Sequence, residues 1–373
     1  MNQKNPFLVE GYLSPEYFCD RVEETALLTR HLTNDCNVAL IAPRRLGKSG
    51  LIMNCFHQDG IQKAYHCIYV DIYDTKNLGE FVYTLGGAIL NALKSKGRAV
   101  WEAFLAAVQS LKSTISFNIN GMPEWTLAVG EISTPDVTLE EIFAYLNTAD
   151  RPCLVAIDEF QAIAAYPEKT VEATLRKHIQ NCHNAHFVFS GSKRHMMAQM
   201  FATQAHPFYH SSSIMGLDPI PETTYHDFAN RHLASIGKEV DADGFHYLYD
   251  RFGGITWYIQ YVLNMLYSMK TTDTCLGLPY ISVCISDILS QHKFAYQALL
   301  YQLTAKQKEV LFAIAREDSP QSVMTQEFLQ KYRLGASTVQ GAVKALLDKD
   351  FITQDEGCFQ LCDKFLEIWV RGK

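Results

Sequence analysis

The 373-residue sequence lacks any apolar run that approaches the roughly 20 residues needed to span a bilayer, and Met1 to Asn5 do not begin a secretory signal. It also lacks a C-x-x-C pair, although it contains ten cysteines. This scatter argues against a disulfide or zinc framework and favours reduced cysteines in a cytoplasmic protein. No internal repeat or low-complexity tract is visible.

An excess of positive charge is missing too. The net charge of −7 gives no global attraction to nucleic acid, so such binding would need a local basic patch. What is present is an ordinary globular composition, with 48% hydrophobic and 20% charged residues. The chain is too long for one average core, and two or three domains are expected.

The stretch from Val38 to Ile52 organises the chain. An apolar run that predicts a buried strand ends in a turn, and Gly47, Lys48 and Ser49 begin a helix. The stretch matches the phosphate-loop pattern G-x-x-x-x-G-K-[ST], except that Ala42 stands in the first glycine position. A small alanine is tolerable there if its φ is negative. The alternative is a tight strand–helix turn without a ligand.

Each residue type in this loop has a physical role in phosphate binding. Gly47 lets backbone N–H groups approach the β- and γ-phosphates, and the helix that it starts adds its positive end. Lys48 places an ammonium between the phosphates, and the Ser49 hydroxyl is a hard oxygen ligand for Mg²⁺. The predicted nucleotide-binding loop comprises Ala42, Pro43, Arg44, Arg45, Leu46, Gly47, Lys48, Ser49 and Gly50.

Another stretch, Arg151 to Glu159, predicts an apolar strand that ends in two adjacent carboxylates, Asp158 and Glu159. Strand interiors exclude charge, so acids occur where a strand emerges at the carboxyl edge of the sheet, where ligands bind. This Walker B pattern predicts that Asp158 holds the Mg²⁺ shell and that Glu159 polarises the attacking water as general base. Taken alone, such a pair more often caps the next helix; the upstream phosphate loop favours the nucleotide interpretation.

Further elements are expected around these motifs. The strand from His186 ends near Ser192, a candidate catalytic sensor of the γ-phosphate or the water, with a plain loop as the alternative. Asp20 is expected to cap a helix before the phosphate loop, and Thr138 a short helix that leads to Tyr145. Residues 97–135 are interpreted as an insertion in which an Asn-Gly turn predicts a β-hairpin.

Three domains are predicted. Residues 1–220 form an α/β domain around a parallel sheet, and residues 221–280 form a small helical lid over the nucleotide edge. Residues 281–373 contain a leading helix, three further helices and a strand hairpin, which is a winged-helix plan. From Tyr301 onward the sequence has ten Lys and Arg residues and ten Asp and Glu residues, so this segment has no excess of positive charge for phosphate contacts. The side chains expected to face a DNA groove are Ser337, Thr338, Gln340 and Lys344.

These motifs resemble the archaeal and bacterial ATPase family within the signal-transducing P-loop ATPases, which are relatives of the AAA ATPases and origin-recognition proteins. The matching segments are Phe18 to Glu24, Ala42 to Ser49, Ile157 to Gln161, Ser190 to Ser192 and Gly253 to Tyr258. The resemblance implies an AAA-like P-loop NTPase sheet with a helical lid and a C-terminal winged helix. The family usually has Gly in place of Ala42 and Pro in place of Thr256.

The resemblance also implies that the segment around Phe18 and Arg21 lies against the adenine and favours ATP over GTP; an N-K-x-D guanine motif is absent from the sequence. The leading hypothesis is an ATPase switch. Slow Mg²⁺-dependent hydrolysis of ATP to ADP would change the lid and reposition the winged helix against duplex DNA or a protein. The alternative is a nucleotide-binding module without turnover that docks protein partners. A small-molecule kinase is disfavoured because Glu159 would activate water. Oligomeric state stays open.

Overall fold

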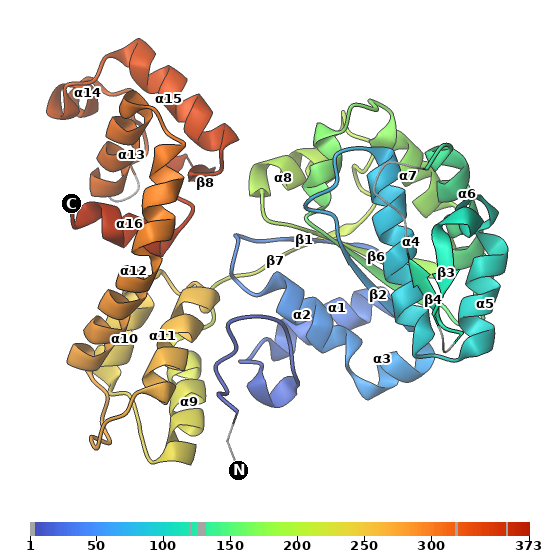
Figure 1. Cartoon of the computed structure of the whole chain (residues 1–373), viewed down its shortest axis with the longest axis horizontal. Helices are drawn as coiled ribbons and strands as arrows, with labels where there is room; N and C mark the ends of the chain where they lie inside the picture. Colours follow the sequence, from blue (N-terminus) through green and yellow to red (C-terminus); the bar gives the residue numbers. More distant parts are fainter. Residues whose placement is uncertain (1–3, 119–120, 126–131, 318–319, 356) are drawn as a thin grey trace. The chain divides into compact units, whose positions relative to one another are not determined.

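The computed structural model describes residues 4–118, 121–125, 132–317, 320–355 and 357–373. The chain forms two compact units (Figure 1). One unit is Glu10–Ile220, and the other combines Met1–Val9 with Pro221–Lys373. The predicted division of residues 221–373 into a lid and a winged-helix domain, and the placement of the lid over the nucleotide edge, stay predictions.

The described residues of the first unit contain a five-stranded parallel sheet. Its order is β2-β5-β6-β1-β7, made of β2 (His66–Asp71), β5 (Cys153–Asp158), β6 (Ala185–Gly191), β1 (Val38–Ile41) and β7 (Ser213–Gly216). Parallel strands present their carboxyl ends at one edge. Because β6 lies between β1 and β5, the ends of the loop strand, the acidic strand and the Ser192 strand follow one another along that edge.

Successive side chains of the strands enter two hydrophobic clusters, one on each face of the sheet. Val38 and Leu40 enter a cluster with α1 (Val22–Leu32), α2 (Lys48–Phe56) and α3 (Asp59–Ala64). Val155 and Ile157 enter the larger cluster with α4 (Leu78–Lys94), α5 (Arg98–Ala107), α6 (Pro135–Thr148), α7 (Val171–Gln180) and α8 (Arg194–Ala202). Both faces are covered, as apolar strands of a parallel sheet require, and the α/β prediction is confirmed.

The segment interpreted as an insertion adds a small second sheet. After α5 and a 3₁₀ segment, Gln109–Thr114, strand β3 (Ile115–Phe117) pairs antiparallel with β4 (Pro123–Trp125). The central residues before Gly121 in the predicted turn, 119 and 120, lie outside the described residues. Trp101 and Phe104 of α5 are buried in the larger cluster, so this segment is anchored to the core of the unit.

Two predicted helix caps are wrong. Asp20 does not cap α1: the cap position is Arg21, with a left-handed φ of 65°, and no described side chain caps that end. Thr138 lies inside α6 and is fully buried. Helix α6 starts one turn earlier because Pro135, whose fixed φ suits the first helical position, follows the cap residue Thr134.

The second unit begins with a helical bundle of α9 (Glu222–Leu233), α10 (Ala242–Arg251) and α11 (Thr256–Ser268). The chain's N-terminal segment completes it. Phe7 is fully buried against the rings of Phe228, His232 and Tyr267. The Asn264 side chain donates a 2.7 Å hydrogen bond to the Phe7 carbonyl. The N-terminal segment is therefore an integral part of a bundle formed more than 200 residues later.

The C-terminal part of this unit starts with the long helix α12 (Leu278–Tyr301). It continues through α13 (Ala305–Glu317), α14 (Gln326–Tyr332) and α15 (Ala336–Asp348) to the antiparallel pair β8 (Ile352–Asp355) and β9 (Cys358–Leu361). Three helices followed by a hairpin match the predicted winged-helix order. The hairpin's predicted turn includes residue 356, which lies outside the described residues.

An additional helix, α16 (Lys364–Arg371), follows the hairpin and was not predicted. The Asp363 carboxylate caps it by accepting hydrogen bonds from the backbone N–H groups of Phe365 and Leu366. The Phe365 ring is fully buried, 5.1 Å from the ring of Tyr258 on α11. Helix α16 thereby ties the winged-helix segment to the helical bundle within the unit.

Among the described residues, no helix has the length and apolar character that a bilayer crossing requires.

The burial of Phe7 predicts a large contribution to stability. Phe7→Ala should lower the free energy of unfolding by about 3–5 kcal/mol, because a cavity replaces a buried ring. The matched control is Phe294→Ala, since this α12 side chain is 79% exposed; its cost should stay within about 0.5 kcal/mol. Denaturant unfolding followed by tryptophan fluorescence measures both. Equal effects would show that the N-terminal segment does not stabilise the bundle.

Candidate functional site

The turn between β1 and α2 has the backbone of an anion-binding loop. Gly47, at φ 101°, precedes the first helical residue, Lys48, and no described side chain caps the start of α2. The first N–H groups of this helix are therefore available to an anion. Ala42 is buried and keeps a negative φ, which is the condition under which alanine replaces the usual glycine. Arg45 is left-handed at φ 67°, and Leu46 is buried in the core.

Lys48 is a buried cation, only 6% exposed. Its ammonium donates hydrogen bonds to the carbonyl oxygens of Ala42 at 2.9 Å and Pro43 at 3.1 Å, both in the loop itself. Burial lowers the pKa of Lys48, and the charges of Glu159 and Asp158 oppose that shift. The predicted phosphate-binding lysine and the two predicted acids therefore share one electrostatic environment.

Asp158, at the end of β5, is 5% exposed and well supplied with donors. Its Oδ2 accepts a 2.7 Å hydrogen bond from the Ser49 hydroxyl and another from the Tyr69 hydroxyl. Its Oδ1 accepts the backbone N–H of Glu159 at 3.0 Å. Burial by itself raises the pKa of Asp158, but the hydroxyl hydrogen bonds and the charge of Lys48 outweigh burial, and the pKa is lowered. Asp158 is therefore held as a carboxylate.

Glu159 turns the chain at a left-handed φ of 55°, directly before the 3₁₀ segment Phe160–Ala165. Its Oε2 accepts a 2.7 Å hydrogen bond from the hydroxyl of Ser192, just beyond β6. The same oxygen accepts a hydrogen bond from the buried amide of Gln161. The structure thus brings Ser192 and Glu159 into direct contact.

The segment before the loop contacts the first turn of α2. The Phe18 ring lies so close to Gly50 that a Cβ at Gly50 would stand 3.1 Å from the Phe18 Cε2 atom. The Arg21 guanidinium, 4% exposed as a residue, donates to Glu24 at 2.6 Å and to the Leu46 carbonyl at 3.5 Å. Phe18 and Arg21 are therefore attached to the loop from one side. Within the loop, the guanidinium carbon of Arg44 lies 5.4 Å from the Tyr73 ring centre.

Sequence reasoning missed two side chains at the site and assigned no role to a third. Tyr69 and Asp71 come from β2, and Asp71 is paired in register with Asp158. Burial, followed by the charges of Asp158 and Glu159, raises the pKa of Asp71, although a hydrogen bond from the Tyr73 N–H opposes the shift. Tyr69 could be suspected only from its position two residues before Asp71. Gln161 belongs to the matching segment Ile157 to Gln161, but the sequence assigned it no role.

The oxygen donors of Ser49 and Asp158 fit Mg²⁺ chemistry. Both are hard ligands, and they lie 2.7 Å apart. In the described ranges of the chain, no group of three or more His, Cys, Asp or Glu side chains is arranged to hold a metal ion. Proteins usually bind Mg²⁺ through one or two side chains together with substrate phosphates. The pair therefore suits Mg²⁺ that arrives with a nucleotide.

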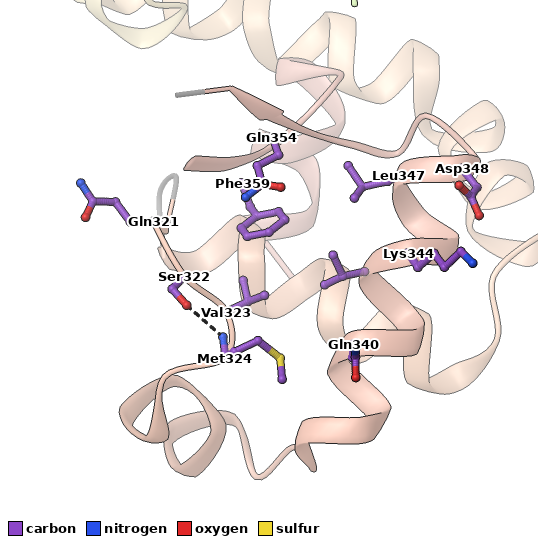
Figure 2. Close-up of a pocket in the computed structure, with 11 residues that line it drawn as sticks. Gln321, Ser322, Val323, Met324, Gln340, Lys344, Leu347, Asp348, Gln354 and Phe359 are labelled. Atoms are coloured by element: carbon purple, nitrogen blue, oxygen red, sulfur yellow. Dashed lines mark hydrogen bonds between the residues drawn. The ribbon is translucent and has the colours of Figure 1, made fainter. Parts of the chain in front are cut away.

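A separate hollow of about 420 Å³ lies between α15, the β8–β9 hairpin and residues 321–324 (Figure 2). Val323, Met324, Leu347 and Phe359 give it apolar walls. Polar and charged side chains also line it: Gln321, Ser322, Gln340, Lys344, Asp348 and Gln354. Gln340 and Lys344, which were expected to face a DNA groove, border this hollow.

A family model described as "Probable winged helix domain" matches residues 294–372. A search of curated proteins with this sequence gave no significant match. Among solved structures, a Walker-type ATPase of Pyrococcus abyssi is similar, with a TM-score of 0.65 and 16% identity over 98% of this chain and 99% of that one.

Two proteins of Aeropyrum pernix are similar as well. The ORC2 protein, solved as ADPNP and ADP complexes, has a TM-score of 0.56 and 15% identity over 100% of this chain and 98% of its own. The ORC1 protein, solved in complex with DNA, has a TM-score of 0.53 and 12% identity over 99% of this chain and 96% of its own. The chain therefore has the fold of the Walker-type and ORC-type P-loop ATPases, with a parallel sheet followed by a winged helix.

Proposed function

We propose that this protein binds ATP with Mg²⁺ at the carboxyl edge of the sheet and hydrolyses it slowly. One observation carries the proposal: two hydrogen bonds, Ser49 to Asp158 and Ser192 to Glu159, join the loop, the acidic strand and β6 around the buried Lys48. The similar ORC2 protein was solved with ADPNP and ADP, which supports a nucleotide as the ligand.

Each residue of the site has a separate proposed role in ATP hydrolysis. The backbone N–H groups after Gly47 and the ammonium of Lys48 would neutralise phosphate charge. Ser49 and Asp158 would hold Mg²⁺, which stabilises negative charge developing on the phosphate oxygens. Glu159 would accept the proton of the attacking water, and Ser192 would contact the γ-phosphate as a sensor. Ser192 and Gln161 already donate hydrogen bonds to the Oε2 of Glu159, so the attacking water would be oriented by the other carboxylate oxygen, Oε1.

Phe18 and Arg21 are proposed to select the base. The Phe18 ring borders the first turn of α2 at Gly50 and is flanked by the Tyr12 ring at 5.9 Å. An aromatic wall of this kind offers stacking area to adenine. ATP and ADP are accordingly the proposed ligands. The proposed location of the protein is the cytoplasm.

The switch would act on the second unit as a whole. Phe365 of α16 packs against Phe252 and Tyr258 of the helical bundle. The Tyr258 hydroxyl accepts a 2.9 Å hydrogen bond from the backbone N–H of Lys364. Because the bundle and the winged-helix segment share this core, nucleotide turnover is proposed to move them together against duplex DNA or a protein partner.

A second candidate function rests on the hollow beside α15. The similar ORC1 protein was solved with DNA, which supports a nucleic-acid interface. The apolar walls favour a protein partner instead. Lys344 shares the lining with the acidic Asp348, so the hollow is not the basic surface that phosphate contacts require. In that candidate the protein is a nucleotide-stabilised module that docks proteins through its winged helix.

Replacing Glu159 separates the two candidates. Glu159→Gln keeps size and hydrogen bonding but removes the base, so single-turnover hydrolysis should fall by about 10²–10⁴ while ATP affinity stays within a few fold. Asp158→Asn should weaken Mg²⁺-dependent ATP affinity as well as the rate. Wild-type turnover no faster than that of Glu159→Gln would mean that the glutamate activates nothing.

The winged helix has its own test. If α15 enters a DNA groove, Lys344→Glu combined with Gln340→Ala should abolish a salt-sensitive shift of duplex DNA and leave ATP binding intact. Lys308→Glu, a charge change on the neighbouring helix α13, is the matched control. A wild-type protein that gives no such shift would assign the winged helix to protein docking.

A further inference from the structure

We propose that Tyr69 is a positioning residue that fixes the carboxylate of Asp158 for Mg²⁺. The inference rests on the proposed function, because it concerns the same metal site. Tyr69 lies outside residues 42–50 in the sequence, and neither the phosphate-loop motif nor the acidic-strand motif includes it. Its assignment comes from the register of the sheet and from the hydrogen bonds of Asp158.

Register explains how Tyr69 reaches the acid. Strands β2 and β5 run parallel, with Tyr69 opposite Ala156 and Asp71 opposite Asp158. Side chains of β2 alternate: Ile68 and Val70 are buried in the larger cluster, while Tyr69 packs against the cluster on the α2 face. A tyrosine at this position is long enough to place its hydroxyl at the end of the neighbouring strand.

The hydrogen bonds show what that hydroxyl does. The Oδ2 of Asp158 accepts from both Tyr69 and Ser49, and its Oδ1 accepts from the Glu159 N–H. Donors from β2, α2 and the following turn therefore hold the two carboxylate oxygens. Ser49 is itself a proposed metal ligand, whereas the Tyr69 hydroxyl on β2 is not. The Tyr69 hydrogen bond to Oδ2 can therefore hold the carboxylate in place with or without a bound metal ion.

This arrangement follows the usual organisation of metal sites, in which an outer hydrogen bond orients a ligating carboxylate. Loss of such a partner typically costs about tenfold to a hundredfold in metal affinity or activity. A neutral hydroxyl is suited to the role, because it orients the carboxylate without cancelling the negative charge that attracts the cation.

The test compares ATP titrations in excess MgCl₂ and in EDTA, by calorimetry. The readout is the ratio of the two dissociation constants. Tyr69→Phe should reduce the Mg²⁺-dependent gain in ATP affinity about tenfold or more, with affinity in EDTA unchanged. The control Tyr145→Phe removes another buried tyrosine hydroxyl, on α6 against Phe104, and should keep the wild-type ratio.

The outcomes separate this inference from the proposed function. A wild-type ratio retained by Tyr69→Phe would overturn the positioning role alone. Equal weakening of ATP binding in both conditions would show that Tyr69 only supports the fold, which also overturns it. A wild-type protein whose ATP affinity is the same in MgCl₂ and EDTA would instead overturn the metal assignment of Ser49 and Asp158.

Discussion

The burial of opposite charges at one edge of the sheet is the constraint on which the site depends. Lys48 and Asp158 are both nearly inaccessible to water, and a buried ion is costly unless hydrogen bonds and counter-charges replace its hydration. Loop carbonyls receive the ammonium, and the Ser49 and Tyr69 hydroxyls donate to the carboxylate. The strand order makes this compensation available, because the carboxyl ends of β1, β6 and β5 follow one another along one edge of the sheet.

The second unit depends on aromatic packing rather than on charge. Phe7 from the N-terminus and Phe365 from α16 are both fully buried, and each anchors a distant segment to the helical bundle. The chain passes from one unit to the other after Val9 and again after Ile220. A conformational change in either connection would therefore act on the second unit as one packed body. This is the physical basis for proposing that the winged helix moves with the bundle and not independently of it.

Local patterns predicted the features that neighbouring residues determine. The apolar runs of β1 and β5 and the acids that end β5 follow from the burial of strand interiors. The prediction that Thr138 caps a helix was wrong because Pro135, three residues earlier, is the stronger helix-start residue. Tyr69 and Phe7 could not be predicted, because their roles depend on contacts with residues 89 and more than 200 positions away. Helix α16 has only 8 residues, so its amphipathic pattern extends over little more than two turns.

The central claim is that the loop around Lys48 binds nucleotide phosphates. Calorimetric titration of ATP with MgCl₂ into the wild type and Lys48→Ala tests it most directly, with Lys63→Ala as a control from the neighbouring helix α3. Loss of the charge-assisted contact, worth about 1.5–3 kcal/mol, should weaken binding about tenfold to a hundredfold in Lys48→Ala alone. Equal ATP affinity in the wild type and in Lys48→Ala would contradict the account.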